Sequence, residues 1–356
     1  MLIASAGGPD RLADRGLPTA AFRVREAGHP QLADVAIVRA PSAIEERPMP
    51  LPTQGLWWKG RRSEAPQIPR EFGTGSTVES LWTGAARLRP GCPLVSVSSA
   101  DGGVGRSTLA AALGGVLALA VPGPVIGVDA NLRAWGGLEH RVARRSAATV
   151  WDAVCAGDAL ARPPVVERLT QLGPTGLRVL VGESAMSTQR RPPSWLELFG
   201  VIGHLRSVYS LAVLDLAPAA VAPVWRALAW ATVPVVVSRA TVDSLQHTMR
   251  LLAHMKAVGL HETVDRTVVV VMATAPSVAR EVRAVQQLAA KAAAHLVRVP
   301  FDPVLARPQA LDPRSMSKAT RSALVEAATA VVDRCPVDLA APGATDEAAT
   351  DGGSKP

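Results

Sequence analysis

A glycine-rich turn between two apolar runs constrains the fold of this chain more than any other feature. Residues 95–108 read VSVSSADGGVGRST, and a run rich in alanine and leucine follows them. Gly102, Gly103 and Gly105 permit backbone conformations in which successive N–H groups face inward and form a nest for an anion. A helix that starts near Ser107 would direct its positive end at the same place. The sequence therefore predicts a buried strand, a phosphate-binding loop and a helix, in this order.

The loop departs at two positions from the Walker A consensus G-x-x-x-x-G-K-[ST]. Ala100 replaces the first glycine and Arg106 replaces the lysine. The guanidinium group keeps the positive charge but is not interchangeable with an ammonium group. Ser107 retains the hydroxyl that can bind Mg²⁺ beside phosphates. We expect ATP and Mg²⁺ as ligands, and the alternative is a turn that binds nothing. The predicted nucleotide contacts in the loop are Asp101, Gly102, Gly103, Val104, Gly105, Arg106, Ser107 and Thr108.

Seven short apolar runs recur from Cys92 onward. Their hydrophobicity is continuous rather than alternating, which indicates strands buried on both faces, as in a parallel sheet. Helical stretches lie between most of them, so we expect the α/β class with a doubly wound, mostly parallel sheet of about seven strands. The runs are Leu94–Ser98, Val125–Val128, Leu177–Val181, Leu211–Leu214, Val233–Val237, Thr267–Val271 and His295–Val299.

The motifs fall at one edge of this predicted sheet. The loop follows the first run, Asp129 ends the second, Asp215 ends the fourth and Pro300–Pro303 follow the seventh. Doubly wound sheets bind ligands outside the carboxyl ends of their strands. An aspartate at a strand end can also be a helix cap or a turn residue. Two such aspartates together with a phosphate loop favour a functional site.

Four segments in this order resemble the ParA/MinD family of P-loop ATPases. The resemblance covers roughly Cys92 to Pro336 and implies a P-loop NTPase fold of the MinD/ParA type. The second segment is similar to switch I, the third to Walker B and switch II, and the fourth, with Pro300 and Asp302, to a nucleotide-binding segment near the base. The segments are the loop, VIGVDAN at 125–131, LAVLDLAP at 211–218 and VPFDP at 299–303.

The resemblance also implies a role for each matching residue. Asp129, Asn131 and Asp215 would serve catalysis. Ser107 would hold Mg²⁺ together with Asp129 and Asp215. Family members form a sandwich dimer, which makes a homodimer an expectation for this chain.

The departures from the family pattern gather at the catalytic positions. Asp101 stands where the family has a signature lysine that reaches the partner subunit's nucleotide, and a carboxylate there would repel phosphate oxygens. Asn131 replaces a second switch I aspartate, and Ala220 replaces a switch II glycine. Met272–Thr274 lie where relatives commonly offer an asparagine to adenine. We therefore expect a degenerate member that binds nucleotide and hydrolyses it slowly or not at all.

Composition predicts three regions. Residues 1–90 are rich in Pro, Gly and Arg and are expected to be largely disordered, 91–336 form the P-loop domain, and 337–356 form a disordered tail. Within the first region, Trp57–Arg62 combines two tryptophans with three cations. This segment would dock a partner or a membrane surface, or cover an apolar patch of the domain itself.

The uncharged run 107–128 is long enough to suggest a membrane helix. Pro122-Gly123-Pro124 interrupts it, so we expect a buried helix, a turn and a strand instead. Three cysteines without metal-site spacing, and no visible signal peptide, favour the cytoplasm.

The formal net charge of +8 is compatible with nucleic acid, but the basic residues are scattered. The densest cluster contains Arg307, Arg314, Lys318 and Arg321. Three functions stay open: an ATP-binding switch that recruits or positions an unknown protein partner, a catalytically dead scaffold in a secretion, pilus or conjugation assembly, and a partition ATPase that coats nonspecific DNA.

Overall fold

The computed structural model describes residues 72, 75–89, 91–132, 137–183, 190–219, 222–277, 279–293 and 295–336. The chain divides into two units, Met1–Ile37 and Val38–Pro356, and every described residue lies in the second. The segment Trp57–Arg62 and the tail 337–356 lie outside the described residues.

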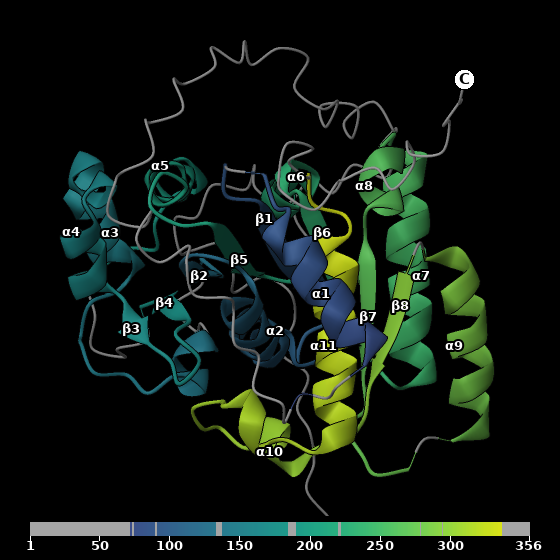
Figure 1. The fold of residues 1–356 in the computed structure, drawn as a ribbon. Coiled ribbons are helices and arrows are strands. Elements are labelled where there is room, and N and C mark those ends of the chain that lie inside the picture. Colours follow the sequence, from purple (N-terminus) through teal and green to yellow (C-terminus); the bar gives the residue numbers. More distant parts are fainter. Residues whose placement is uncertain are drawn as a thin grey trace, which may run out of the picture. The chain divides into compact units, whose positions relative to one another are not determined.

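Eight strands form one sheet: β1 (Leu94–Ser99), β2 (Val125–Ala130), β3 (Gln171–Leu172), β4 (Arg178–Leu180), β5 (Leu211–Leu216), β6 (Val233–Arg239), β7 (Val268–Met272) and β8 (His295–Val299). Their order is β3-β4-β2-β5-β1-β6-β7-β8 (Figure 1). Only β3 runs antiparallel to its neighbour, and all other pairs are parallel. The predicted α/β class and mostly parallel sheet are confirmed. Each predicted run overlaps one strand, several of which extend one or two residues further, and the sequence missed only the two-residue β3.

Helices cover both faces of the sheet and enclose an apolar core on each side. One face carries α1 (Ser76–Ala86), α2 (Arg106–Ala120) and α11 (Lys318–Val332). The other carries α3 (Val150–Ala156), α4 (Pro163–Leu169), α5 (Trp195–Leu205), α6 (Ala222–Trp230), α7 (Val242–Ala257), α8 (His261–Asp265) and α9 (Arg280–Ala292). Short helices complete the connections: η7 (Leu138–Arg141), η8 (Gly157–Ala161), α10 (Pro303–Ala306) and η9 (Pro313–Ser315).

The uncharged run 107–128 folds as a helix, a turn and a strand, as predicted. α2 ends at Ala120, the turn contains Gly123 with a positive φ of 113°, and β2 begins at Val125. Most residues of α2 are buried within the domain. Among the described residues, no helix has both the length and the apolar character needed to cross a membrane.

Helix α1 lies within the region 1–90 but packs on the domain. Figure 1 shows it beside α11. Leu81 is fully buried, and Gly84 lies so close to α11 that a Cβ there would be 2.7 Å from Val332 Cγ1. The N–H of Arg89 donates to the carbonyl of Pro336 over 3.0 Å. The folded domain therefore includes α1, and the sequence contains no local signal for this packing.

We predict that Leu81→Ala lowers the free energy of unfolding by about 2–5 kcal/mol, because it removes a fully buried side chain between α1 and the core. Ser80→Ala, one residue earlier on the exposed side of the same helix, should change it by less than about 0.5 kcal/mol. Urea unfolding followed by circular dichroism measures both variants. Equal stability of the two would show that α1 is not part of the cooperative unit.

Candidate nucleotide-binding site

The loop between β1 and α2 has the backbone geometry of an anion nest. Gly103 and Gly105 adopt positive φ angles of 67° and 93°, which a residue with a side chain rarely adopts. Gly105 is the N-cap of α2, and no side chain caps the helix there. The N–H groups of the first helical turn are therefore offered to an anion. Val104 and Thr108 are buried and anchor the loop on both sides of Gly105.

Two aspartates face one another at the carboxyl ends of neighbouring strands. Asp129 of β2 and Asp215 of β5 are register partners in the parallel pair. They are 2% and 1% exposed. One Asp129 oxygen accepts the N–H of Asn131 over 3.1 Å. Among the described residues, Asp129 Oδ2 and both carboxylate oxygens of Asp215 accept no hydrogen bond. Buried carboxylate oxygens without partners indicate a site built for a cation.

The electrostatics of the pair agree with this conclusion. Burial raises the pKa of Asp215 to about 6, although the nearby Ser107 hydroxyl and the Arg106 charge lower it. Burial, and then the charge of Asp215, raises the pKa of Asp129 well above its ordinary value. Two carboxylates in such a place resist ionisation together unless a cation joins them. With the Ser107 hydroxyl they form the all-oxygen ligand set that Mg²⁺ prefers, so these residues fit that ion.

Gly182, which follows β4, completes the surroundings of Asp129. A Cβ at this position would lie 2.8 Å from Asp129 Oδ2, so only glycine lets the backbone approach the carboxylate. β4 pairs with β2, and this pairing brings Gly182 to the site. Sequence reasoning missed Gly182, because nothing local distinguishes it from any other glycine at a strand end.

Arg106 turns toward the acidic pair. Its Nη1 donates to the carbonyl of Leu216, the residue after Asp215, over 3.0 Å. Burial lowers the pKa of this guanidinium, while the charges of Asp215 and Asp129 raise it. Arg106 replaces the Walker A lysine, and its side chain is held by the carbonyl at the end of β5.

Asp101 is held on the other side of the loop. Its Oδ1 lies 2.7 Å from Nδ1 of His247, which belongs to α7. The main-chain carbonyl of Asp101 accepts the hydroxyl of Ser99. His247 gives this carboxylate a partner within the chain, at the position where the family resemblance implies a lysine. The sequence offered no signal for the pair, whose members are 146 residues apart.

Of the two residues predicted to lie near the adenine base, Asp302 has hydrogen-bond partners within the chain. Asp302 accepts the N–H groups of Val304 over 2.9 Å and Ser317 over 2.8 Å. Burial acts to raise the pKa of Asp302, but these hydrogen bonds outweigh it and the pKa is lowered. Asp302 therefore caps α10 and ties it to the start of α11, and Pro300 precedes it after β8. Met272 lies against the loop, where a Cβ on Gly105 would be 3.0 Å from its sulfur.

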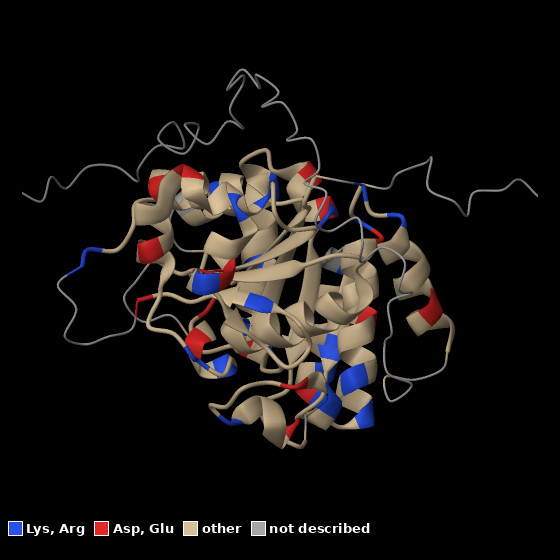
Figure 2. Ribbon diagram, turned by 60° about the vertical axis from the view of Figure 1, so that its left-hand side comes forward, with Lys and Arg blue, Asp and Glu red and all other residues tan. Residues whose placement is uncertain are grey.

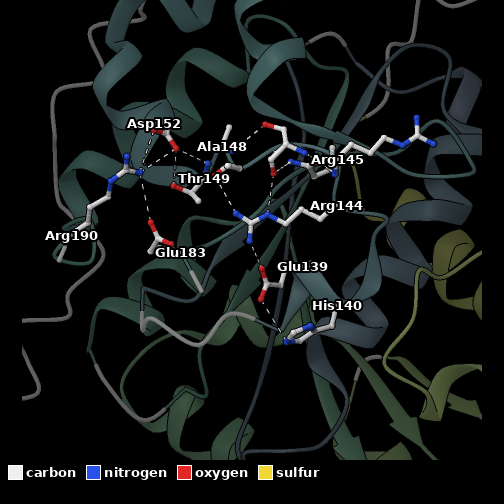
Figure 3. Close-up of polar contacts among 12 residues, drawn as sticks. Glu139, His140, Arg144, Arg145, Ala148, Thr149, Asp152, Glu183 and Arg190 are labelled. Atoms are coloured by element: carbon white, nitrogen blue, oxygen red, sulfur yellow. Dashed lines mark hydrogen bonds and ion pairs between the residues drawn. The ribbon is translucent and has the colours of Figure 1, made fainter. Parts of the chain in front are cut away.

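The segment that follows Asn131 returns to the loop before it reaches α3. A Cβ on Gly137 would lie 2.8 Å from Ser107 Oγ, so this segment touches the predicted magnesium ligand. Figure 3 shows how it continues: Arg144 points to Glu139, and the two are 2.5 Å apart. Residues 133–136 and Ala220 lie outside the described part of the chain.

Arg190 pairs with Asp152 of α3 over 3.3 Å and with Glu183 over 3.7 Å (Figure 3). The Asp152 side chain also accepts the N–H of Thr149 in the capping box of α3. A solvent-open cleft lined by Asp129, Asn131, Glu183 and Arg190 lies between these residues. The chain beside Asp129 is thus held in place by ion pairs and by the capping box of α3.

The opposite pKa shifts of Asp215 and Asp302 predict opposite pH dependence. The raised pKa of Asp215 means that its contribution to stability is present below pH 4 and is lost as the pH rises to about 6. Asp215→Asn should therefore raise the free energy of unfolding above pH 7 by about 3 kcal/mol, with the gain vanishing near pH 4.

Asp302→Asn is the matched control. Its lowered pKa gives stability that is present at neutral pH and lost on acidification, so this substitution should destabilise the protein at pH 7. Urea titrations in EDTA between pH 4 and pH 8 measure both variants. The same sign for both would contradict the electrostatic description of the acidic pair.

No protein-family model matches the sequence, and a comparison with curated proteins gives no match. Solved structures do match the fold. The chain is similar to a ParA family ATPase from Chlorobium tepidum, with a TM-score of 0.54, 18% identity, and coverage of 67% of this chain and 98% of that one. It is also similar to cobyrinic acid a,c-diamide synthase from Mycobacterium smegmatis with a bound ATP analogue and magnesium, with a TM-score of 0.50, 17% identity, and coverage of 69% and 98%.

The cell division ATPase MinD of Pyrococcus furiosus matches with 19% identity over 68% of this chain and 98% of that one, at a TM-score of 0.47. Sequence identities below 20% support a common fold and nothing more specific. The order of strands, the loop after β1 and the aspartates after β2 and β5 agree with the fold that the sequence resemblance implied. The described domain has the fold of the ParA/MinD-like P-loop ATPases.

Proposed function

We propose that this protein is a cytoplasmic switch of the ParA/MinD type that binds ATP with Mg²⁺ and, in the bound state, recruits or positions a protein partner. One observation carries the proposal: a glycine nest at a helix N-terminus adjoins two buried carboxylates that lack partners among the described residues. The nest suits phosphate oxygens, and the carboxylates suit the cation that accompanies them. A homodimer belongs to the same proposal.

Binding would be coupled to the segment that carries Gly137. Mg²⁺ supplies positive charge to the phosphates and to the carboxylates when it is bound. Ser107, Asp129 and Asp215 would hold it. Because Gly137 lies against the Ser107 hydroxyl, a ligand on that hydroxyl favours one arrangement of the segment over others. The nucleotide thereby selects the surface that a partner meets.

We propose slow hydrolysis or none. The Asn131 amide has no carboxylate with which to activate water, although its backbone N–H orients Asp129. Asp101 brings a negative charge, paired with His247, to the position where the family has a cation. Phosphoryl transfer depends on positive charge aimed at the phosphates, and this loop supplies less of it.

A catalytically dead scaffold is the second candidate, since both unusual loop residues have partners inside the chain. The basic cluster gives less support to a DNA-coating function. Arg314 pairs with Asp312 over 2.8 Å, and Arg321 donates to the carbonyls of Arg314 and Met316. Figure 2 shows basic and acidic residues interspersed on the ribbon in this view. The segment Trp57–Arg62 stays a proposed contact for a partner or a membrane.

The anion nest predicts different effects of two matched glycine substitutions on nucleotide binding. Gly103→Val should weaken ATP and ADP binding at least about tenfold, because a β-branched residue cannot easily keep the φ of 67° that the nest needs. Gly259→Val places the same side chain at a φ of 88° in the turn after α7, and neither glycine has an atom within 4 Å of an added Cβ. It should change the affinity less than about twofold.

Isothermal titration calorimetry on folded protein measures both. Equal losses in the two variants would place the nucleotide elsewhere. Absence of binding in the wild type would favour the scaffold.

The charge pattern of the loop makes a prediction about turnover. The wild type should hydrolyse ATP near the background rate. Asp101→Lys combined with Arg106→Lys should tighten ATP binding and raise turnover, since every 1.4 kcal/mol of restored transition-state stabilisation is about a tenfold gain in rate. A phosphate-release assay measures both proteins. Robust wild-type activity that Asp215→Ala abolishes would contradict the proposal of slow hydrolysis.

A further inference from the structure

A hydrogen bond joins the loop that follows β1 to helix α7. Asp101 Oδ1 lies 2.7 Å from Nδ1 of His247, and the two side chains are 19% and 47% exposed. A carboxylate accepts hydrogen bonds and does not donate them, so the hydrogen belongs to Nδ1 of the imidazole ring. The bond holds the Asp101 side chain on α7, beside the loop whose N–H groups form the nest.

We propose that His247 is a positioning residue of the nucleotide site. It holds the Asp101 carboxylate on α7 and thereby keeps it from the N–H groups of the loop, which phosphate oxygens need. The inference rests on the proposed nucleotide site and names a residue that controls the affinity of that site.

Asp101 is a competitor for those N–H groups because of its place in the sequence. The side chain of an aspartate readily accepts the N–H of the residue two positions later, and for Asp101 that residue is Gly103 of the nest. Other aspartates of this protein make this contact: Asp129 with the N–H of Asn131 over 3.1 Å, Asp302 with that of Val304 over 2.9 Å and Asp312 with that of Arg314 over 3.0 Å. Asp101 has its carboxylate on His247 instead. A released carboxylate would bring a negative charge into the nest and oppose phosphate there.

Both ends of the contact are fixed by neighbouring strands. β1 pairs with β6, and Ser99 at the end of β1 donates its hydroxyl to the Asp101 carbonyl. At the end of β6, the N–H of Arg239 donates to the hydroxyl of Ser244 in the first turn of α7 over 3.0 Å. His247 lies in the next turn of the same helix. The separation of Asp101 and His247 is therefore set by the pairing of two strands and not by the two side chains alone.

The first test releases the Asp101 carboxylate by His247→Ala. Calorimetric titration of ATP and of ADP in excess MgCl₂ should give a dissociation constant at least about fivefold higher than that of the wild type, because the freed carboxylate competes with phosphate for the nest. His247→Asn should stay within about twofold of the wild type, because its amide N–H can take the place of Nδ1–H.

His254→Ala is the matched control. His254 is another exposed histidine of α7, and its ring contacts Trp225, with 5.0 Å between the ring centroids. This substitution should change the affinity for either nucleotide by less than about twofold. Thermal melting checks that each variant is folded.

A second substitution separates positioning from every other role of His247. Asp101→Ala removes the competing carboxylate, so it should bind ATP at least as tightly as the wild type. Adding His247→Ala to Asp101→Ala should then change the dissociation constant by less than about twofold. A residue that acted through the stability of α7, or that touched phosphate itself, would lose affinity in both backgrounds.

The contact can also be observed without nucleotide. Nitrogen-15 NMR of the histidine rings at about pH 8 should show the hydrogen on Nδ1 of His247 in the wild type. In Asp101→Ala this preference should be lost, because the carboxylate that fixes it is gone.

A loss of affinity in His247→Ala that persists unchanged in the Asp101→Ala background would overturn the inference and leave the proposed function intact. Wild-type affinity in His247→Ala, or a wild-type His247 ring without hydrogen on Nδ1, would overturn the inference too. Absence of nucleotide binding by the wild type would overturn the proposed function itself.

Discussion

The parallel pairing of β2 with β5 is the constraint on which the site depends. It sets Asp129 opposite Asp215 at the carboxyl end of the sheet, and helices on both faces exclude water from the two carboxylates. Placing two like charges there costs free energy unless a cation or a proton accompanies them. In this structure the two carboxylates lie beside a loop that offers hydrogen-bond donors to an anion. A cation and a phosphate together satisfy both requirements.

The charged residues of the loop are arranged so that each has a partner within the chain. Arg106 reaches the end of β5, and Asp101 reaches His247 on α7. Both substitutions change the electrostatics at the phosphate position, and both are supported by contacts to rigid elements. Such a loop retains the geometry for binding, while the charges that accelerate phosphoryl transfer are rearranged. This is the physical basis of the proposal that the protein acts as a nucleotide-dependent switch with slow hydrolysis or none.

Contacts also link the site to a larger surface. Gly137 touches the Ser107 hydroxyl, and the chain then passes through η7 to a stretch where the Gln171 side chain accepts the N–H groups of Arg145 and Ser146 over 2.7 and 3.1 Å. Arg190 closes the other side by pairing with Asp152 of α3. A change at Ser107 therefore acts on a segment whose far end is fixed. That arrangement suits a two-state element that a ligand can bias.

Local signals in the sequence determined the elements of this protein. Continuous apolar runs predicted seven of the strands, because a strand buried on both faces needs apolar residues at every position. The glycines predicted the loop, because positive φ angles leave few other residues available. The aspartates at two run ends predicted the edge of the sheet where the site lies. Helix α1 and strand β3 were missed, since α1 owes its place to α11 and β3 has only two residues.

Tertiary structure alone decided which groups meet. His247 and Asp101 are 146 residues apart, and Arg106 and the Leu216 carbonyl are 110 residues apart. The residues next to such a side chain in the sequence do not indicate which distant group it contacts. The need for glycine at position 182 likewise exists only because β4 lies next to β2 and brings that backbone against Asp129. Sequence specified the chemistry available at the edge of the sheet, whereas the order of the strands determined which of these groups lie side by side.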